Sequence, residues 1–140
     1  MGAATVLMAS ELSLPENVRG IIADCPYSSP EAIIRKVCRD WTRPESSFFW
    51  VRLGARLLGG FDPLACSAVE AVQHTDIPIL LIHGEADRFV PCDMSREIYA
   101  ACKGKKMLLT VPDAGHGISY MVDTEAYRNV VEQFIRMCET

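Results

Sequence analysis

Hydrophobic and polar positions divide the chain into two kinds of segment. Short apolar runs bounded by Gly or Pro are typical of strands buried in a parallel sheet. Such runs predict a first strand that ends near Asp24, a second at residues 77–82 and a third at residues 106–112. The second run, IPILLIHG, gives the clearest strand pattern of the chain.

Apolar residues spaced three and four apart predict helices between these strands. Ser29 has the features of a helix cap, because Pro30 follows at the first helical position and Glu31 lies in the first turn. That helix is expected to run to about Arg39. Further helices are predicted up to about Ser10, in a short segment after Asp62, at residues 92–102 and at residues 124–138.

Residues 41–60 are too aromatic for a simple solvated connection and predict a helical insert that covers another part of the protein. Two interpretations of the insert stay open. Its aromatic side chains either pack into the core or form a cap that lines an acyl or aromatic substrate pocket. The large apolar residues concerned are Trp41, Phe48, Phe49, Trp50 and Leu53.

The alternation of strands and helices predicts the α/β class, with about three parallel strands joined by right-handed helical crossovers. Parallel sheets are normally covered on both faces and have more strands than this. The strand near Ile21 is therefore expected to present an unpaired edge. We interpret residues 1–140 as part of a larger sheet domain.

Composition excludes several classes of protein. The 140 residues include 14 basic and 18 acidic side chains, a net charge of −4, so a nucleic-acid partner is not expected. No apolar run approaches the roughly 20 residues of a membrane helix, and no signal peptide is evident, so a cytoplasmic location is expected. The scattered cysteines predict reduced, mostly buried thiols. They are Cys25, Cys38, Cys66, Cys92, Cys102 and Cys138.

Two candidate catalytic residues follow predicted strands. Functional groups in open α/β sheets gather beyond the carboxyl ends of the strands. Asp87 lies in the loop HGEADRFVP after the second strand, and His116 lies between two glycines in the loop DAGHG after the third. A histidine held by a carboxylate activates a hydroxyl nucleophile, so this pair requires a third group.

Other residues compete for these roles. Asp24 also ends a strand and is an alternative acid. Ser28 and Ser29 are possible nucleophiles, but they lack a strand-to-helix elbow, and Ser29 is better explained as a helix cap. Cys92 lies near Asp87 but stands where a helix starts, which favours a buried inert thiol.

The remaining histidines carry weaker signals. His83 is interpreted as a packed residue at a strand end, and His74 as a residue of a polar loop. The histidines have no H-x-x-x-H spacing and no supporting cluster of carboxylates or cysteines. We therefore expect no metal site.

Four segments together resemble the α/β-hydrolase superfamily, in the bacterial branch near serine aminopeptidases and dienelactone-hydrolase-like enzymes. They are MGAATVLM, IIADCPYSS, IPILLIHGEADRFVP and VPDAGHG, in that order. The resemblance covers essentially the whole chain. It implies that Asp87 is the triad acid, that His116 is the triad base, and that the backbone N–H of Met1 is one oxyanion donor. It also implies a small-molecule acyl substrate and no cofactor.

The chain departs from this family at its start. The resemblance places the nucleophile in a G-x-S-x-G elbow immediately ahead of Met1, so the chain corresponds to a C-terminal half without its serine and is expected to be inactive alone. The alternative hypothesis is a non-catalytic half-domain that pairs through its sheet edge with a second copy or another chain. Because of that exposed edge we expect the chain to form a homo-oligomer.

Overall fold

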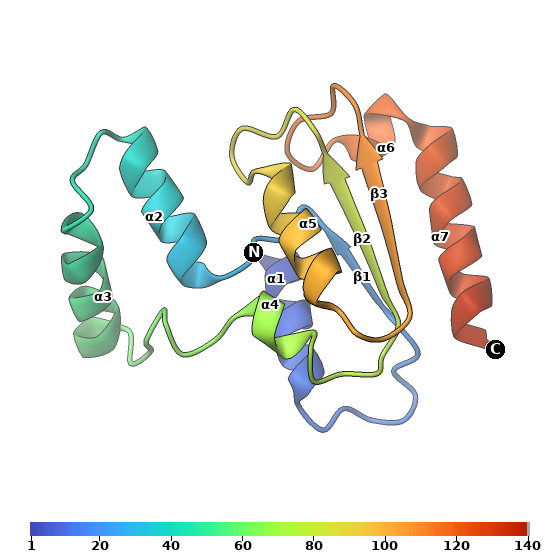
Figure 1. The fold of residues 1–140 in the computed structure, drawn as a ribbon, viewed down its shortest axis with the longest axis horizontal. Helices are drawn as coiled ribbons and strands as arrows, with labels where there is room; N and C mark the ends of the chain where they lie inside the picture. Colours follow the sequence, from blue (N-terminus) through green and yellow to red (C-terminus); the bar gives the residue numbers. More distant parts are fainter. Residues whose placement is uncertain (140) are drawn as a thin grey trace.

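The computed structural model describes residues 1–139 as a three-stranded sheet with helices on both faces (Figure 1). The strands are β1 (Ile21–Asp24), β2 (Ile79–Gly84) and β3 (Lys106–Val111). The helices are α1 (Gly2–Met8), the short 3₁₀ helix η1 (Ala9–Glu11), α2 (Pro30–Asp40), α3 (Ser47–Leu58), α4 (Ala68–Ala71), α5 (Cys92–Ala101), α6 (Ser119–Val122) and α7 (Thr124–Glu139). Among residues 1–139, no helix is both long enough and apolar enough to cross a membrane.

The sheet is parallel and has the order β1-β2-β3. Every residue of the central strand β2 is buried, as the unbroken apolar run predicted. Ile79 pairs with Ile21 on one side and with Lys106 on the other. This shared register brings the carboxyl ends of all three strands to one edge of the sheet.

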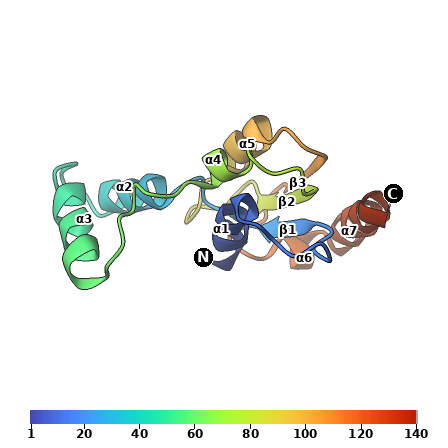
Figure 2. The same cartoon turned by 90° about the horizontal axis from the view of Figure 1, so that it is seen from below.

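Alternate residues of β2 supply two separate cores. Ile79 and Leu81 pack with Leu7 of α1 and Ile98 of α5 in one cluster, which α4 completes. Leu80 and Ile82 point the other way and pack against Phe134 of α7. Figure 2 shows α4 and α5 on the opposite face of the sheet from α7. The predicted arrangement of a parallel sheet between helices is confirmed.

Several predicted boundaries were wrong by a few residues. The second strand begins at Ile79 rather than at residue 77, and it continues to Gly84 because His83 still pairs with Thr110 of β3. The short helix predicted after Asp62 begins only at Ala68. The first helix changes to 3₁₀ geometry after Met8, and the short helix α6 was not predicted.

Local capping explains where two helices begin. The Ser29 hydroxyl accepts a hydrogen bond from the N–H of Ala32, and Pro30 occupies the first turn of α2, as predicted. Ser67 plays the same role for α4 by accepting from the N–H of Glu70. The Ser67 cap was not recognised in the sequence, and it accounts for the late start of α4.

Helices α2 and α3 project together away from the sheet (Figure 1). The guanidinium of Arg52 in α3 binds both carboxylate oxygens of Asp62, at 2.9 and 2.7 Å, which ties the end of the pair to the following loop. Between the helices, Arg35 lies 4.1 Å above the ring of Phe48. Helices are thus present in the segment 41–60, and α2 belongs to the same projection.

We expect Gly84→Ala to destabilise the protein. A β-carbon at Gly84 would lie 2.2 Å from the carbonyl oxygen of Ala114, so backbone would have to move. Overpacking of this kind costs about 1–3 kcal/mol of unfolding free energy. Urea denaturation followed by circular dichroism measures the change.

Gly54→Ala is the matched control. A β-carbon at Gly54 in α3 meets no atom within 4 Å, so this variant should be neutral or more stable by roughly 0.5–1 kcal/mol. Equal stability of the Gly84→Ala variant and the unmodified protein would contradict the close approach of the two loops.

Candidate active site

Asp87 is held in a tight loop just beyond the carboxyl end of β2. Its backbone N–H donates to the carbonyl of Gly84 at 3.2 Å. Its carboxylate oxygen Oδ1 accepts hydrogen bonds from the N–H groups of Phe89 at 2.8 Å and Val90 at 2.9 Å. The side chain has no exposed area. A buried carboxylate requires such partners, so the loop and the charge stabilise each other.

His116 is presented by the loop after β3. Gly117, which follows it, has a φ of 69°, a left-handed conformation that Gly adopts without strain. Gly115, on the other side of His116, does not have a positive φ, and the second left-handed residue of this turn is Asp113, with a φ of 59°. The turn therefore depends on Asp113 and Gly117.

The two loops are joined by backbone hydrogen bonds. The N–H of Glu85 donates to the carbonyl of Val111 at 2.9 Å, which continues the pairing of β2 with β3. The N–H of Ala86 donates to the carbonyl of Ala114 at 3.0 Å. The absent side chain of Gly84 permits this approach. Sheet geometry thus places the predicted acid beside the predicted base.

His116 and Asp87 form a direct hydrogen bond. The distance from Nδ1 of His116 to Oδ2 of Asp87 is 2.6 Å. An ionised carboxylate only accepts hydrogen bonds, so Nδ1 carries a proton, and the neutral form of the ring then has its lone pair at Nε2. The imidazole is 41% exposed, and the ring of Phe89 contacts it edge-on with 5.3 Å between centroids. This arrangement suits a general base whose Nε2 faces a substrate.

The pKa of Asp87 lies below its ordinary value. Burial opposes ionisation and by itself raises the pKa, but the N–H of Val90, the imidazole of His116 and the N–H of Phe89 together outweigh burial. Asp87 is therefore a carboxylate at neutral pH, as an orienting acid must be.

His83 lies beneath this pair and is fully buried. Its Nε2 is 2.9 Å from the carbonyl of Val90 and 3.3 Å from Oδ2 of Asp87, and its Nδ1 is 2.6 Å from the hydroxyl of Ser95. Because a carbonyl only accepts, Nε2 carries a proton, and Nδ1 is hydrogen-bonded to the Ser95 hydroxyl. The interpretation of His83 as a packed strand-end residue agrees with these contacts, and the residue also supports the acid loop.

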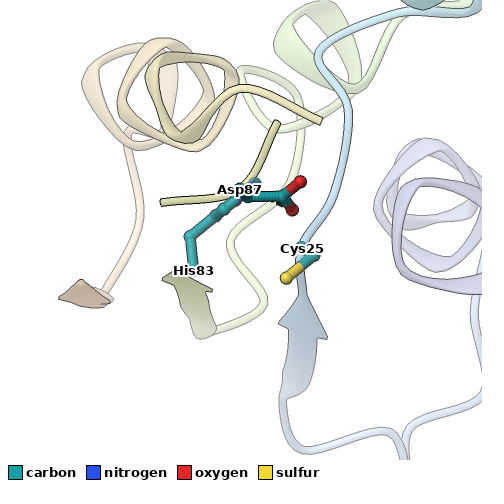
Figure 3. Close-up of side chains that lie close together, drawn as sticks. All are labelled: Cys25, His83 and Asp87. Atoms are coloured by element: carbon teal, nitrogen blue, oxygen red, sulfur yellow. Dashed lines mark ion pairs between the residues drawn. The ribbon is translucent and has the colours of Figure 1, made fainter. Parts of the chain in front are cut away.

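Cys25 is the residue directly after β1, and its thiol lies close to the side chains of His83 and Asp87 (Figure 3). It has a left-handed φ of 53°. The thiol lies 3.1 Å from Oδ1 of Asp24 and accepts a hydrogen bond from the N–H of Gly117 at 3.3 Å. Burial raises the pKa of Cys25 to about 12, so it is a neutral thiol rather than a nucleophile.

The three side chains in Figure 3 do not suit a metal ion. Ligand atoms of Cys25, His83 and Asp87 lie within 4.8 Å of one another. A metal ligand must offer a lone pair, and thiol ligands bind as thiolates. Both His83 nitrogens are engaged, and the raised pKa of Cys25 keeps its proton. The cluster is better explained as hydrogen-bonded support for the acid.

An apolar pocket of about 330 Å³ opens beside His116. It lies among residues from α2, from the loops after β1 and β2, and from the chain start. The lining residues are Met1, Cys25, Tyr27, Pro30, Ile33, Ile34, Phe61, Phe89, Val90 and His116. Met1, the predicted oxyanion donor, thus shares a pocket with the predicted base. No serine or threonine of residues 1–139 lines this pocket.

The competing residues have other partners. Asp24 receives a hydrogen bond from the hydroxyl of Tyr127 at 3.2 Å, while Asp87 is the carboxylate bonded to His116. Ser29 caps α2. Cys92 is buried, and burial raises its pKa. None of these residues takes a place in the pocket.

Sequence analysis missed most of the pocket lining. Cys25 was treated only as one of several buried thiols, although its position directly after a strand is where functional groups gather. Tyr27, Phe61 and Phe89 carried no periodic signal because they lie in loops. Only the folded chain brings them beside His116.

Solved structures show the same architecture. The Pyrococcus furiosus esterase PF2001 aligns with a TM-score of 0.67 and 20% identity over 100% of this chain and 51% of its own. Acetyl xylan esterase 1 from Thermoanaerobacterium aligns with a TM-score of 0.65 and 18% identity over 99% of this chain and 43% of its own. Pyrococcus horikoshii acylaminoacyl peptidase aligns with a TM-score of 0.64 and 18% identity over 99% of this chain and 22% of its own. The fold is that of the α/β-hydrolase superfamily.

Sequence comparison defines the family more narrowly. The chain belongs to the PhoPQ-activated pathogenicity-related protein family, whose model matches residues 50–140. The uncharacterized protein YqkD of Bacillus subtilis is 25% identical over 96% of the chain, and the uncharacterized protein YfhR of Escherichia coli O157:H7 is 39% identical over 96%. The chain spans 45% and 42% of these relatives' lengths.

We expect Asp87→Asn to destabilise the fold at neutral pH by about 1–3 kcal/mol, because the charge that His116 and two N–H groups stabilise is lost. The pKa of Asp87 is lowered on folding, so its carboxylate stabilises the protein above the unfolded pKa of roughly 3.9. That contribution disappears as pH falls through the folded pKa. Unfolding free energies across this pH range measure the difference.

Asp93→Asn is the control for this substitution. The Asp93 side chain is 80% exposed and pairs with Arg96 on the surface, so its loss should change stability by less than about 1 kcal/mol. If the difference in unfolding free energy between wild type and Asp87→Asn stayed constant from pH 7 to pH 2, it would contradict the lowered pKa of Asp87.

Proposed function

We propose that this chain is the C-terminal part of a serine hydrolase that cleaves esters, amides or thioesters. The observation that carries the proposal is the 2.6 Å hydrogen bond between His116 and the buried Asp87, at the rim of an apolar pocket. An oriented imidazole with a free Nε2 is the base that a serine nucleophile requires.

The nucleophile in this proposal is a serine immediately ahead of Met1. Met1 is the N-cap residue of α1 and lines the same pocket as His116, which supports a nucleophile near His116 at the preceding position. In the α/β-hydrolase arrangement, the residue after the nucleophile gives its N–H to the oxyanion. We assign that donor to Met1. The chain spans less than half of YqkD and YfhR, which supports a longer natural protein.

The proposed reaction proceeds in two displacements. Nε2 of His116 takes the proton of the serine hydroxyl as its oxygen attacks the acyl carbon, and the same nitrogen then protonates the leaving group as its bond to carbon breaks. Water repeats these steps on the acyl-enzyme, which releases the acid and the free serine. Asp87 stays ionised throughout, holds the ring by Nδ1 and stabilises the imidazolium.

Labelling with a fluorophosphonate tests the nucleophile directly. We expect the natural gene product to be labelled, and mass spectrometry of its peptides to place the label on a serine just before the Met1 position. This 140-residue chain should not be labelled under the same conditions. If the natural product begins at Met1 and takes no label, the hydrolase proposal fails and only the fold assignment remains.

His116→Gln should lower kcat of the natural product on an activated ester by at least about 10³-fold, because the general base is lost. His74→Gln is the matched control. His74 is exposed and lies before β2, outside the pocket, so that variant should retain wild-type kcat. Steady-state kinetics with p-nitrophenyl acetate measures both. An equal loss of kcat in the two variants, or no loss of kcat in His116→Gln, would count against His116 as the base.

A second candidate is self-association through the edge of the sheet. Among residues 1–139, β1 pairs only with β2, so its outer edge has unpaired backbone groups. Ile22 on β1 is 42% exposed and Ile135 on α7 is 49% exposed. They flank a hollow of about 380 Å³. An open edge beside an apolar patch favours association.

We expect this chain to be a dimer or larger at micromolar concentration, and Ile22→Lys to shift it toward monomer by placing a charge in the patch. Leu57→Lys changes an equally apolar residue that is 74% exposed on α3 and should have no such effect. Multi-angle light scattering measures the mass. A monomeric mass for the unmodified chain would exclude this mode of association.

A further inference from the structure

Helix α2 has an apolar face that its neighbours cover only in part. Its cap, its acidic first turn and its apolar positions make it strongly amphipathic. Such a face normally packs into a core, yet α2 has no fully buried residue. Only its first turns touch the body of the protein, where Ile33 packs beside Val90 and Tyr27.

The rest of that face borders a second hollow of about 540 Å³ between α2 and α3. Its lining is apolar except for Arg43 and Ser47. The lining residues are Ile33, Ile34, Val37, Cys38, Trp41, Arg43, Ser47, Trp50 and Val51. We call this hollow the α2–α3 groove. Ile33 and Ile34 also line the pocket beside His116, so the two hollows adjoin.

We propose that the substrate carries a long aliphatic acyl chain, with its carbonyl at His116 and its tail along α2 in the α2–α3 groove. This inference rests on the proposed hydrolase function and names its substrate class.

The shape and chemistry of the two hollows support this occupant. Along α2, residues 33 to 41 span about 12 Å, so the joint surface is elongated rather than compact. Among residues 1–139, His116 is the one residue lining its inner part whose side chain carries an imidazole, ammonium, guanidinium or carboxylate group, and Arg43 stands beyond the end of α2. A charged substrate tail would find no side chain of opposite charge between them. A flexible apolar chain gains from each methylene that it buries.

The projection is anchored at its inner end, which keeps the two hollows aligned. The ammonium of Lys36 in α2 donates to the carbonyl of Arg88 in the loop that follows Asp87. Ile33 is packed beside Val90 in the same loop. The loop that holds Asp87 therefore also positions the inner end of the α2–α3 groove. The groove thus keeps a fixed position relative to the proposed catalytic residues.

A series of p-nitrophenyl esters from acetate to palmitate tests the proposal on the natural gene product. Burial of a methylene is worth roughly fourfold in affinity, so kcat/KM should rise at least tenfold between acetate and dodecanoate. A profile that is flat, or that falls beyond acetate, would overturn the proposal. A preference for phenylacetate over dodecanoate would also overturn it, in favour of an aromatic acyl group.

Val37→Trp fills the groove without entering the pocket at His116. It should lower the ratio of dodecanoate to acetate kcat/KM at least tenfold. Leu58→Trp adds the same ring at a position that is 92% exposed and outside the groove, and should leave the ratio unchanged. Equal ratios in the two variants would contradict a chain in the groove.

Tryptophan fluorescence gives a readout that does not depend on catalysis. Both tryptophans of this chain, Trp41 and Trp50, line the groove. A dodecanoic acid brominated near its tail should quench them, whereas dodecanoic acid without bromine should not. Quenching without fluorophosphonate labelling would refute the hydrolase while leaving a groove that binds acyl chains. Labelling without quenching and with a flat ester profile would refute this inference alone.

Discussion

The buried carboxylate of Asp87 is the interaction on which the rest of the site depends. A charge without exposed area is tolerated only when donors surround it. Here the N–H groups of Phe89 and Val90 hold one oxygen, and His116 holds the other. His83 secures the loop from below through the carbonyl of Val90. Removal of the charge would loosen the acid loop, the histidine loop and the entrance to the pocket together.

The parallel sheet supplies the geometry that this charge requires. Because β2 and β3 run in the same direction in register, the loops after them leave the sheet side by side. The hydrogen bond from Ala86 to the carbonyl of Ala114 joins these loops, and only a residue without a side chain fits at Gly84 between them. Cys25, just beyond β1, completes the edge by accepting from the N–H of Gly117. A packed sheet thus fixes positions that flexible loops alone could not hold.

Two apolar surfaces discussed above are uncovered among residues 1–139, and they differ in kind. Ile22 and Ile135 flank the open edge of β1, where unpaired backbone groups suit another strand or chain. The α2–α3 groove is instead a hollow lined by side chains, and it adjoins the pocket at His116. The first surface suits assembly, and the second suits a ligand. Exposed apolar area of either kind works against solubility, so it indicates a partner or a ligand.

The sequence by itself determined the α/β class, the buried central strand and the placement of Asp87 and His116 after successive strands, because local periodicity and strand ends are properties of short segments. It missed the Ser67 cap, since a serine in a polar loop carries little local signal. The tertiary structure alone decided that the pair meets at 2.6 Å and that the thiol of Cys25 lies near the carboxylate of Asp87. Distances and desolvation depend on segments far apart in the chain, which no local pattern encodes.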